Sequence, residues 1–215
     1  MLTVTEAIQQ RRSIRSFRRD PVPENAVHQI LESARLAPSG SNRQPWRFIV
    51  VTGPAEKAKI RRLCRNQAFI EEAPVVFVCC ADLAAYSQAA MRKRYQEFDR
   101  HGVLETFSGL AADPAFRAKL LAEPEPDPGN FLTAAVKNTC IAIEHMVLTA
   151  TALGLGTCWV GSMGEEGELE ALLGLPKNIV AVAVLPVGYP KSTPPPRPRL
   201  SMDKILLRSV PDLKE

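Results

Sequence analysis

The spacing of apolar and polar positions along the chain predicts helices at several places. Thr3 and Glu6 have the spacing of a capping box, and the apolar positions after them predict a first helix of about three turns. A second helix is predicted to begin near Pro23 and to stop at Pro38, with one apolar face along its length. Residues 130–153 predict the longest helix of the chain.

The helix predicted over 130–153 is apolar over most of its circumference. Its expected core-facing side consists of Leu132, Val136, Cys140, Ile143, Met146, Val147, Ala150 and Leu153. Gly154 and Gly156 are expected to end the helix. Such a helix suits a central place, buried by neighbouring elements or by a partner subunit. No window approaches about 18 uninterrupted apolar residues, so no membrane-spanning helix is predicted.

Continuous apolar runs predict the strands. Three runs rich in β-branched and aromatic residues each predict a buried strand, at residues 46–52, 73–81 and 178–188. The segment 157–161 predicts a further short strand, and helices are predicted at 55–66 and 165–173.

Two segments interrupt this pattern. Residues 82–129 show helical periodicity until 122 and then an acidic, proline-rich spacer, 123–129, which is expected to be extended rather than helical. Residues 189–215 begin as a proline-stiffened arm. Without internal repeats or a clear linker, the chain is interpreted as one domain over 1–215, with an insertion at 82–129 and a C-terminal arm at 189–215.

Composition excludes several classes of protein. The 215 residues carry a net charge of +4, from 27 basic and 23 acidic residues, which is a weak bias for a nucleic-acid-binding domain. The N-terminus lacks the apolar core of a signal peptide, and the five cysteines show no CxxC spacing, so we expect reduced thiols and a cytoplasmic location. The three histidines share no ligand spacing, so no metal site is expected.

Three polar segments carry the candidate chemistry: "RRSIRSFRRD" (11–20), "APSGSNRQPW" (37–46) and "PPPRPRL" (194–200). Taken singly, each has an ordinary explanation as a charged helix end, a polar turn or a solvated tail. Taken together, their arginine forks and serine hydroxyls suit a phosphate group. The segment "GLGTCW" is not a dinucleotide fingerprint, because Trp159 replaces the third glycine and a helix precedes it.

These segments, with "GLGTCWVG" and "VGYP", resemble the FMN-dependent nitroreductase family over about residues 1–80 and 130–210, in the family's order. The resemblance implies an α+β three-layer fold with a central, mostly antiparallel sheet flanked by helices. It also implies an intertwined homodimer with FMN at the subunit interface.

The resemblance further implies a set of cofactor-binding residues: Arg11, Arg12, Ser13, Arg15, Pro38, Ser39, Asn42, Cys158, Trp159, Val160, Gly161, Arg197 and Arg199. The first three and the two tail arginines are expected to bind the phosphate and ribityl chain, and Arg15 the pyrimidine edge of the ring. The loop at 38–42 is expected to reach the partner's flavin, and 158–161 to run along the ring. Arg18 and Arg19 match no ligand of the family and are expected to be surface charge.

The implied activity is the transfer of two electrons from NAD(P)H through bound FMN to a small organic acceptor, such as a nitroaromatic or a quinone, by a ping-pong mechanism. Residues 82–129 show no diagnostic match to the lid of the dehalogenating or flavin-destroying relatives, and we interpret them as the segment that selects the acceptor. Tyr86, Tyr95, Phe98 and Phe107 could cover that acceptor, or could simply pack the segment onto the core. A reductive dehalogenase-like or flavin-modifying enzyme stays open as an alternative. A basic nucleic-acid-binding module is less favoured.

Overall fold

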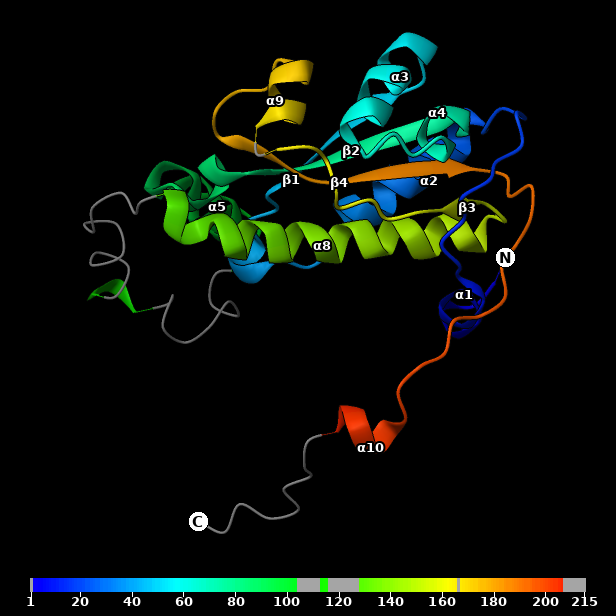
Figure 1. Cartoon of the computed structure of the whole chain (residues 1–215). Helices are drawn as coiled ribbons and strands as arrows, with labels where there is room; N and C mark the ends of the chain where they lie inside the picture. Colours follow the sequence, from blue (N-terminus) through cyan, green and yellow to red (C-terminus); the bar gives the residue numbers. More distant parts are fainter. Residues whose placement is uncertain (1, 104–112, 116–127, 166, 207–215) are drawn as a thin grey trace.

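Helices cover both faces of an antiparallel sheet in the computed structural model, which describes residues 2–103, 113–115, 128–165 and 167–206 (Figure 1). The strands are β1 (Trp46–Val51), β2 (Val75–Asp82), β3 (Gly156–Thr157) and β4 (Ile179–Gly188). Their order across the sheet is β1-β2-β4-β3, and every pair is antiparallel. The predicted α+β class and the three long strands are confirmed.

The long helix α8 (Pro128–Ala152) runs along one face of the sheet beside α2 (Glu24–Arg35). Helices α3 (Pro54–Leu63), α4 (Phe69–Glu72) and α9 (Glu168–Leu173) lie on the opposite face. Phe77 of β2 packs towards α8, whereas its neighbours Val76 and Val78 pack towards α3 and α4. This alternation follows from the two-residue period of a strand, and it divides the core into two layers.

The first helix, α1 (Val4–Gln10), has the predicted capping box. The Thr3 hydroxyl accepts from the backbone N–H of Glu6 at 3.3 Å, and the Glu6 carboxylate accepts from that of Thr3 at 2.7 Å. The helix has seven residues, about two turns where three were expected, because the chain becomes extended at Arg11. The helix predicted over 55–66 is also shorter, because Arg65 and Asn66 adopt positive φ angles of 54° each and separate α3 from α4.

The insertion is described in part. It contains the short helix η2 (Leu83–Tyr86) and α5 (Gln88–Arg100), while residues 104–112 and 116–127 lie outside the described residues. The expectation of an extended spacer is wrong for its last two residues, since Pro128 begins α8. Proline fits there because the first turn of a helix does not need its N–H. The division into one domain, an insertion and an arm stays a prediction.

The predicted apolar face of α8 is partly wrong. The sheet and α2 bury a face that includes the small residues Ala142 and Ala150 together with Ile143 and Met146, and Ala135 packs against β2 and η2. Small side chains let the helix approach the sheet closely. Larger ones point elsewhere: Leu132, expected in the core, is 37% exposed, Ile141 is 41% exposed, and Cys140 is half-buried.

Within the described residues, α8 alone is long and apolar enough over 131–152 to cross a membrane. Core helices of soluble proteins meet the same criterion of length and composition. The fully buried Ile143 and Met146 give α8 the contacts of a core helix. The absence of a membrane-spanning helix stays a prediction.

Candidate cofactor site

An arginine-lined pocket of about 530 Å³ lies between the end of α1, the segment that follows it and the C-terminal arm. Its lining includes six of the residues expected to bind the cofactor: Arg11, Arg12, Ser13, Arg15, Arg197 and Arg199. Pro194, Pro195 and Pro196 complete the wall on the side of the arm. The fold thus brings together two charged segments from opposite ends of the described chain.

The segment after α1 is extended and lies against the edge of the sheet. The backbone N–H of Ile14 donates to the Thr157 carbonyl of β3 at 2.8 Å, and Ser13 forms a parallel bridge with Thr157. The Ile14 side chain is buried. Because side chains alternate along an extended segment, burial of Ile14 directs Ser13 and Arg15 towards the pocket.

Glycine in β3 makes this close approach possible. A Cβ atom at Gly156 would lie 2.4 Å from Cγ1 of Ile14, which is too short for any real contact. The expectation that Gly156 ends the preceding helix is therefore wrong, since it belongs to β3 and pairs with Gly188. Gly154 does end α8, with a φ of +74°.

The five arginines of the pocket have no carboxylate within ion-pair distance among the described residues, although the charge of Arg11 acts on Glu144 of α8. The Arg12 guanidinium is fixed by two hydrogen bonds from Nη1, to the carbonyls of Gln9 at 2.7 Å and Arg11 at 2.8 Å. Its Nε is buried and has no hydrogen-bond partner. Buried donors are normally satisfied, so this arrangement fits an anionic ligand.

Residues 158–161 follow β3 and alternate between inward and outward positions. Cys158 and Val160 are buried, whereas Trp159 is 37% exposed and Gly161 is exposed. Val160 is held by reciprocal hydrogen bonds of 2.9 Å with Val184. Burial raises the pKa of the Cys158 thiol, and nearby Arg15 partly offsets this effect. None of the four lines the arginine-lined pocket, although the adjoining Thr157 pairs with Ser13.

The loop that carries Pro38, Ser39 and Asn42 lies apart from this pocket within one chain. Ser39 Oγ accepts from the backbone N–H of Gln44 at 2.9 Å, and Gly40 N donates to Asn138 of α8 at 3.1 Å. Asn42 has a φ of +50°, in the left-handed region. The expected placement of this loop against a partner's flavin stays a prediction.

Comparison with known proteins decides the family. Residues 8–189 match the sequence profile of the nitroreductase family. The chain belongs to the nitroreductase family.

Relatives of this nitroreductase-family protein span most of its length. A protein of Thermus thermophilus named NADH dehydrogenase is 33% identical over 215 residues, covering 96% of each chain. The FMN reductase (NAD(P)H) of Bacillus subtilis is 30% identical, over 95% of this chain and 73% of its own. A structure from Exiguobacterium sibiricum, solved in complex with FMN, has a TM-score of 0.80 at 25% identity, covering 97% of this chain and 98% of that one.

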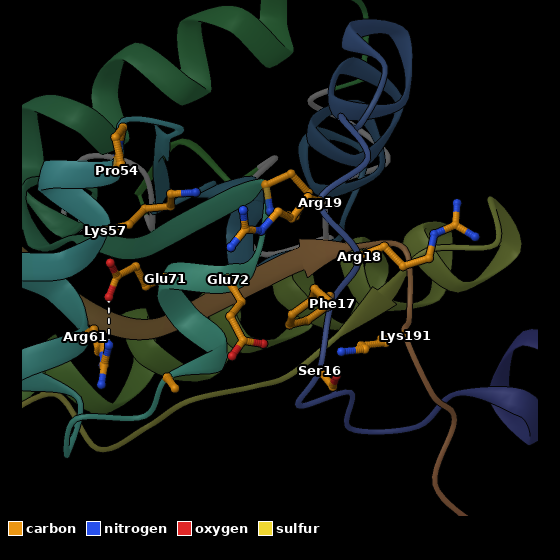
Figure 2. Close-up of a pocket in the computed structure, with 12 residues that line it drawn as sticks. Ser16, Phe17, Arg18, Arg19, Pro54, Lys57, Arg61, Glu71, Glu72 and Lys191 are labelled. Atoms are coloured by element: carbon orange, nitrogen blue, oxygen red, sulfur yellow. Dashed lines mark hydrogen bonds and ion pairs between the residues drawn. The ribbon is translucent and has the colours of Figure 1, made fainter.

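Arg18 and Arg19, expected to be surface charge, are exposed but line a second, larger cavity shown in Figure 2. Arg18 Nε donates to Asp20 at 2.8 Å, and its guanidinium lies 5.1 Å from the centre of the Tyr189 ring. In this nitroreductase-family protein, Arg18 is therefore neutralised locally, unlike the arginines of the first pocket.

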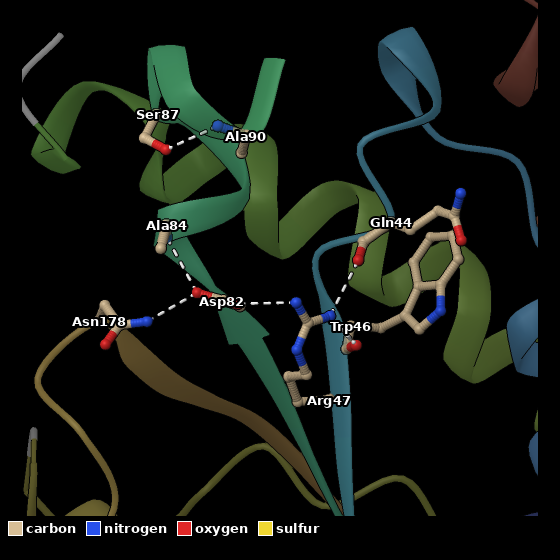
Figure 3. A network of polar contacts seen from close by, with 8 residues as sticks. All are labelled: Gln44, Trp46, Arg47, Asp82, Ala84, Ser87, Ala90 and Asn178. Carbon is tan, nitrogen blue, oxygen red and sulfur yellow. Dashed lines mark hydrogen bonds and ion pairs between the residues drawn. The ribbon is translucent and has the colours of Figure 1, made fainter. Parts of the chain in front are cut away.

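A polar network that the sequence patterns did not reveal fixes the loop before β1 (Figure 3). Arg47 Nη2 donates to Asp82 at 2.7 Å, and Nη1 donates to the carbonyls of Gln44 at 3.0 Å and Trp46 at 2.8 Å. Asp82 also accepts from Asn178 at 2.7 Å. The network ties this loop to the start of the insertion and to β4. Asp82, placed directly after an apolar run, was the one available signal.

The aromatic residues of the insertion pack inward. Tyr86, Tyr95 and Phe98 are all buried, which favours a packing role in the described chain, while Phe107 lies outside the described residues. Tyr86 stacks on Phe131 of α8 with ring centres 5.1 Å apart. Arg43 lies 4.5 Å above the Tyr86 ring, and burial lowers the pKa of its guanidinium. No group of three His, Cys, Asp or Glu side chains is placed to hold a metal in this described part of the chain.

Proposed function

We propose that this protein is an NAD(P)H-dependent oxidoreductase that holds FMN with its phosphate in the arginine-lined pocket. The observation that carries the proposal is the group of five arginines without a carboxylate partner among the described residues, including the unsatisfied Nε of Arg12. The names of its relatives and the FMN complex of a similar structure support the choice of flavin. FMN is favoured over FAD because the chain carries no dinucleotide fingerprint.

The residues of the pocket fit the chemistry of a terminal phosphate. A phosphate takes charge-assisted hydrogen bonds from several directions, which Arg11, Arg12, Arg197 and Arg199 can donate. The Ser13 hydroxyl can donate to a phosphate oxygen or to the ribityl chain. The pocket volume of about 530 Å³ falls in the usual range for small-ligand sites.

When bound, FMN supplies the two-electron chemistry, taking a hydride from NAD(P)H and reducing a small organic acceptor. Arg15, which lines the pocket, would place a positive charge beside the pyrimidine edge of the ring and would stabilise added electrons there. Residues 158–161 offer backbone groups along the ring. Burial raises the pKa of the Cys158 thiol, which disfavours the nucleophilic thiolate form.

We further propose that two chains form a homodimer. Only 33% of the most apolar window of α8 is buried, and Ile141 in it is 41% exposed. Val4 and Ile8 of α1 are 70% and 57% exposed. Figure 1 shows α1, α8 and the arm that leads to α10 (Met202–Ile205) on the side of the molecule away from α3 and α9. Apolar surface on three elements of one side needs cover, which a second copy supplies.

In this dimer, the loop at 38–42 completes the partner's flavin site and the arm at 189–215 lies on the partner subunit. The exposed apolar residues of the arm support this arrangement: Leu200, Met202, Ile205 and Leu206. The insertion at 82–129 selects the acceptor, which we place among nitroaromatics, quinones or similar compounds, and the kinetics are ping-pong.

The first test is the identity of the bound flavin. The purified protein should be yellow, and the flavin released by heat should run as FMN in chromatography. FAD as the main species would contradict the cofactor assignment. Colourless protein that FMN cannot reconstitute, but that binds nucleic acid with a steep salt dependence, would favour a basic binding module instead. Parallel double-reciprocal plots with NAD(P)H and an acceptor would support the ping-pong order.

A further inference from the structure

A cavity of about 820 Å³, larger than the arginine-lined pocket, borders the same N-terminal segment further along the chain. Residues 16–19 form one wall, α3 and α4 form the opposite walls, and Lys191 closes the side of the arm (Figure 2). We call this space the α3–α4 cavity. It shares no lining residue with the arginine-lined pocket.

Positive charge exceeds negative charge in the α3–α4 cavity. Its lining contains five cationic residues and two carboxylates: Arg18, Arg19, Lys57, Arg61 and Lys191, with Glu71 and Glu72. Arg61 pairs with Glu71 at 2.9 Å, and Arg18 pairs with Asp20. Among the described residues, Arg19, Lys57 and Lys191 have no carboxylate within ion-pair distance.

Two cationic side chains of the cavity keep N–H groups that no described residue accepts from. Lys57 is 7% exposed, and its ammonium makes one hydrogen bond, to the Ala73 carbonyl at 2.7 Å. An ammonium group has three N–H donors, so two are left for a ligand. The Nε of Arg61 is buried and has no partner. Figure 2 shows the Arg19 guanidinium turned towards Lys57 from the opposite wall.

The remaining lining is mixed. Phe17, Pro54 and Pro74 are apolar, and the Glu72 carboxylate makes no hydrogen bond or ion pair with described residues. A free carboxylate repels a simple anion but accepts hydrogen bonds from hydroxyl groups. The lining therefore suits a ligand that has an anionic end and a hydroxyl-bearing end.

We propose that the α3–α4 cavity is a second ligand site, which takes a small phosphorylated polyol of the sugar-phosphate or mononucleotide class. Arg19 and Lys57 bind the phosphate, Lys191 adds positive charge on the side of the arm, and Glu72 accepts from the hydroxyl groups. The proposal does not depend on the flavin assignment, because the two cavities have separate linings.

The two cavities are nevertheless neighbours along the backbone. Phe17 forms an antiparallel bridge with Pro190, and Lys191 N donates to the Ser16 carbonyl at 3.0 Å. The same two segments thus continue from one cavity into the other. An experiment must keep the arginine-lined pocket filled, so that a phosphate probe does not bind there.

The experiment is calorimetric titration of the FMN-saturated protein with ribose 5-phosphate, with ribose and inorganic phosphate as comparators. We expect one site per chain for ribose 5-phosphate, binding of inorganic phosphate weaker by about tenfold, and no binding of ribose. If inorganic phosphate binds as tightly as ribose 5-phosphate, the role given to the hydroxyl-bearing end is wrong. If ribose 5-phosphate binds only when FMN is removed, the proposal is overturned and the arginine-lined pocket is its site.

Variants locate the binding. Arg19→Gln with Lys191→Gln, both at exposed positions, should weaken ribose 5-phosphate binding by at least about tenfold without affecting folding. Lys59→Gln is the matched control, because it removes a charge from an exposed position of α3 that does not line the cavity, and it should leave affinity within about twofold. Equal affinities for the double variant and the control would overturn the proposal.

A third variant tests the orientation of the bound ligand, with its hydroxyl groups facing Glu72. Glu72→Gln removes the carboxylate from an exposed position, so it should strengthen binding of inorganic phosphate by a few-fold, of order two to five, while reducing the preference for ribose 5-phosphate. An unchanged preference would show that Glu72 does not face the hydroxyl groups.

Discussion

The two halves of the arginine-rich segment 11–20 line different cavities. Arg11, Arg12 and Arg15 line a pocket in which none of them forms an ion pair with a described carboxylate. Arg18 and Arg19 line a cavity that also contains Glu71 and Glu72, and Arg18 has its own partner in Asp20. Two neighbouring groups of arginines in the sequence therefore have different surroundings, because the packing of distant segments decides which charges have a carboxylate partner.

The largest expected effect concerns the partner subunit. Of the two proposed sites, only the FMN site at the arginine-lined pocket needs a residue segment from the partner. Ile141→Asp places a charge in the proposed α8 interface, where burial without a counterion costs several kcal/mol. We expect dimerisation to weaken by about a hundredfold or more and FMN to be lost. Sedimentation velocity with absorbance in the flavin bands measures both results.

The matched control for this variant is Leu172→Asp on α9, on the other face of the sheet. Leu172 is 38% exposed, close to the 41% of Ile141. This variant should remain a yellow dimer. A yellow, dimeric Ile141→Asp protein would show that α8 is not the interface.

The next largest effect is expected from substituting single arginines that line the two cavities. Arg12→Ala or Arg199→Ala should weaken FMN binding by about ten- to a hundredfold, since a charge-assisted bond to phosphate contributes about 1.5–3 kcal/mol. Arg18→Ala should change it by less than about twofold, because Arg18 already pairs with Asp20. Quenching of FMN fluorescence on titration with apoprotein gives the affinities. Equal losses in all three variants would mean that the decapeptide acts as one diffuse basic patch.

A smaller effect concerns the contact that holds the first half in place. Gly156→Ala brings a methyl group against Ile14, and overpacking of this kind costs about 1–3 kcal/mol. Thermal unfolding should shift down by roughly 2–4 °C for each kcal/mol. Gly161→Ala has open space around the new Cβ and should change stability by less than about 0.5 kcal/mol. Equal shifts in the two variants would contradict the close-packing argument.

The smallest effect is a difference in pH dependence between the two sites. Burial lowers the pKa of the Lys57 ammonium, an effect that nearby Glu71 opposes. Lys57 therefore loses its charge at a lower pH than an ordinary lysine. The affinity for ribose 5-phosphate should begin to decrease at a pH below that at which lysines usually titrate. The other charged groups facing Lys57 are Arg19, Arg61, Lys191 and Glu72.

FMN affinity should change less over this alkaline interval, because the guanidinium groups that bind its phosphate keep their charge. Parallel titrations of the two ligands on the FMN-loaded protein and the apoprotein measure the difference. Lys57→Met, if folded, should remove the pH dependence of ribose 5-phosphate binding. A matching decline of both affinities would contradict the role given to Lys57.

Features that depend on a local stretch of sequence could be predicted, whereas features that depend on contacts between distant segments could not. The run 73–81 could be predicted as a buried strand because its residues are apolar without interruption, and this pattern is visible in the local sequence. The outward position of Leu132 depends on which side of α8 the sheet occupies, and helical periodicity cannot decide this for a helix that is apolar nearly all round. The α3–α4 cavity was not predictable either, since Lys57, Glu72 and Lys191 are separated in the sequence and meet only in the fold.

The candidate site shows the same distinction. The "RRSIR" segment and the tail arginines suggested a phosphate clamp by residue type, and the fold places them around one pocket. The close approach of Ile14 to Gly156 was not predictable, and neither was the hydrogen bond from Arg47 to Asp82. Each joins two segments that are distant in the sequence, so no local pattern indicates the contact.

The arginine-lined pocket joins a segment that directly follows α1 to an arm that follows β4, the last strand of the sheet. During synthesis, the first group of arginines leaves the ribosome well before the second, and the whole sheet is translated between them. The pocket can therefore close only on a chain whose strands have all been translated. Ligand capture at this pocket then reports on the maturation of the protein, since a half-translated or misfolded chain has no means of assembling both walls.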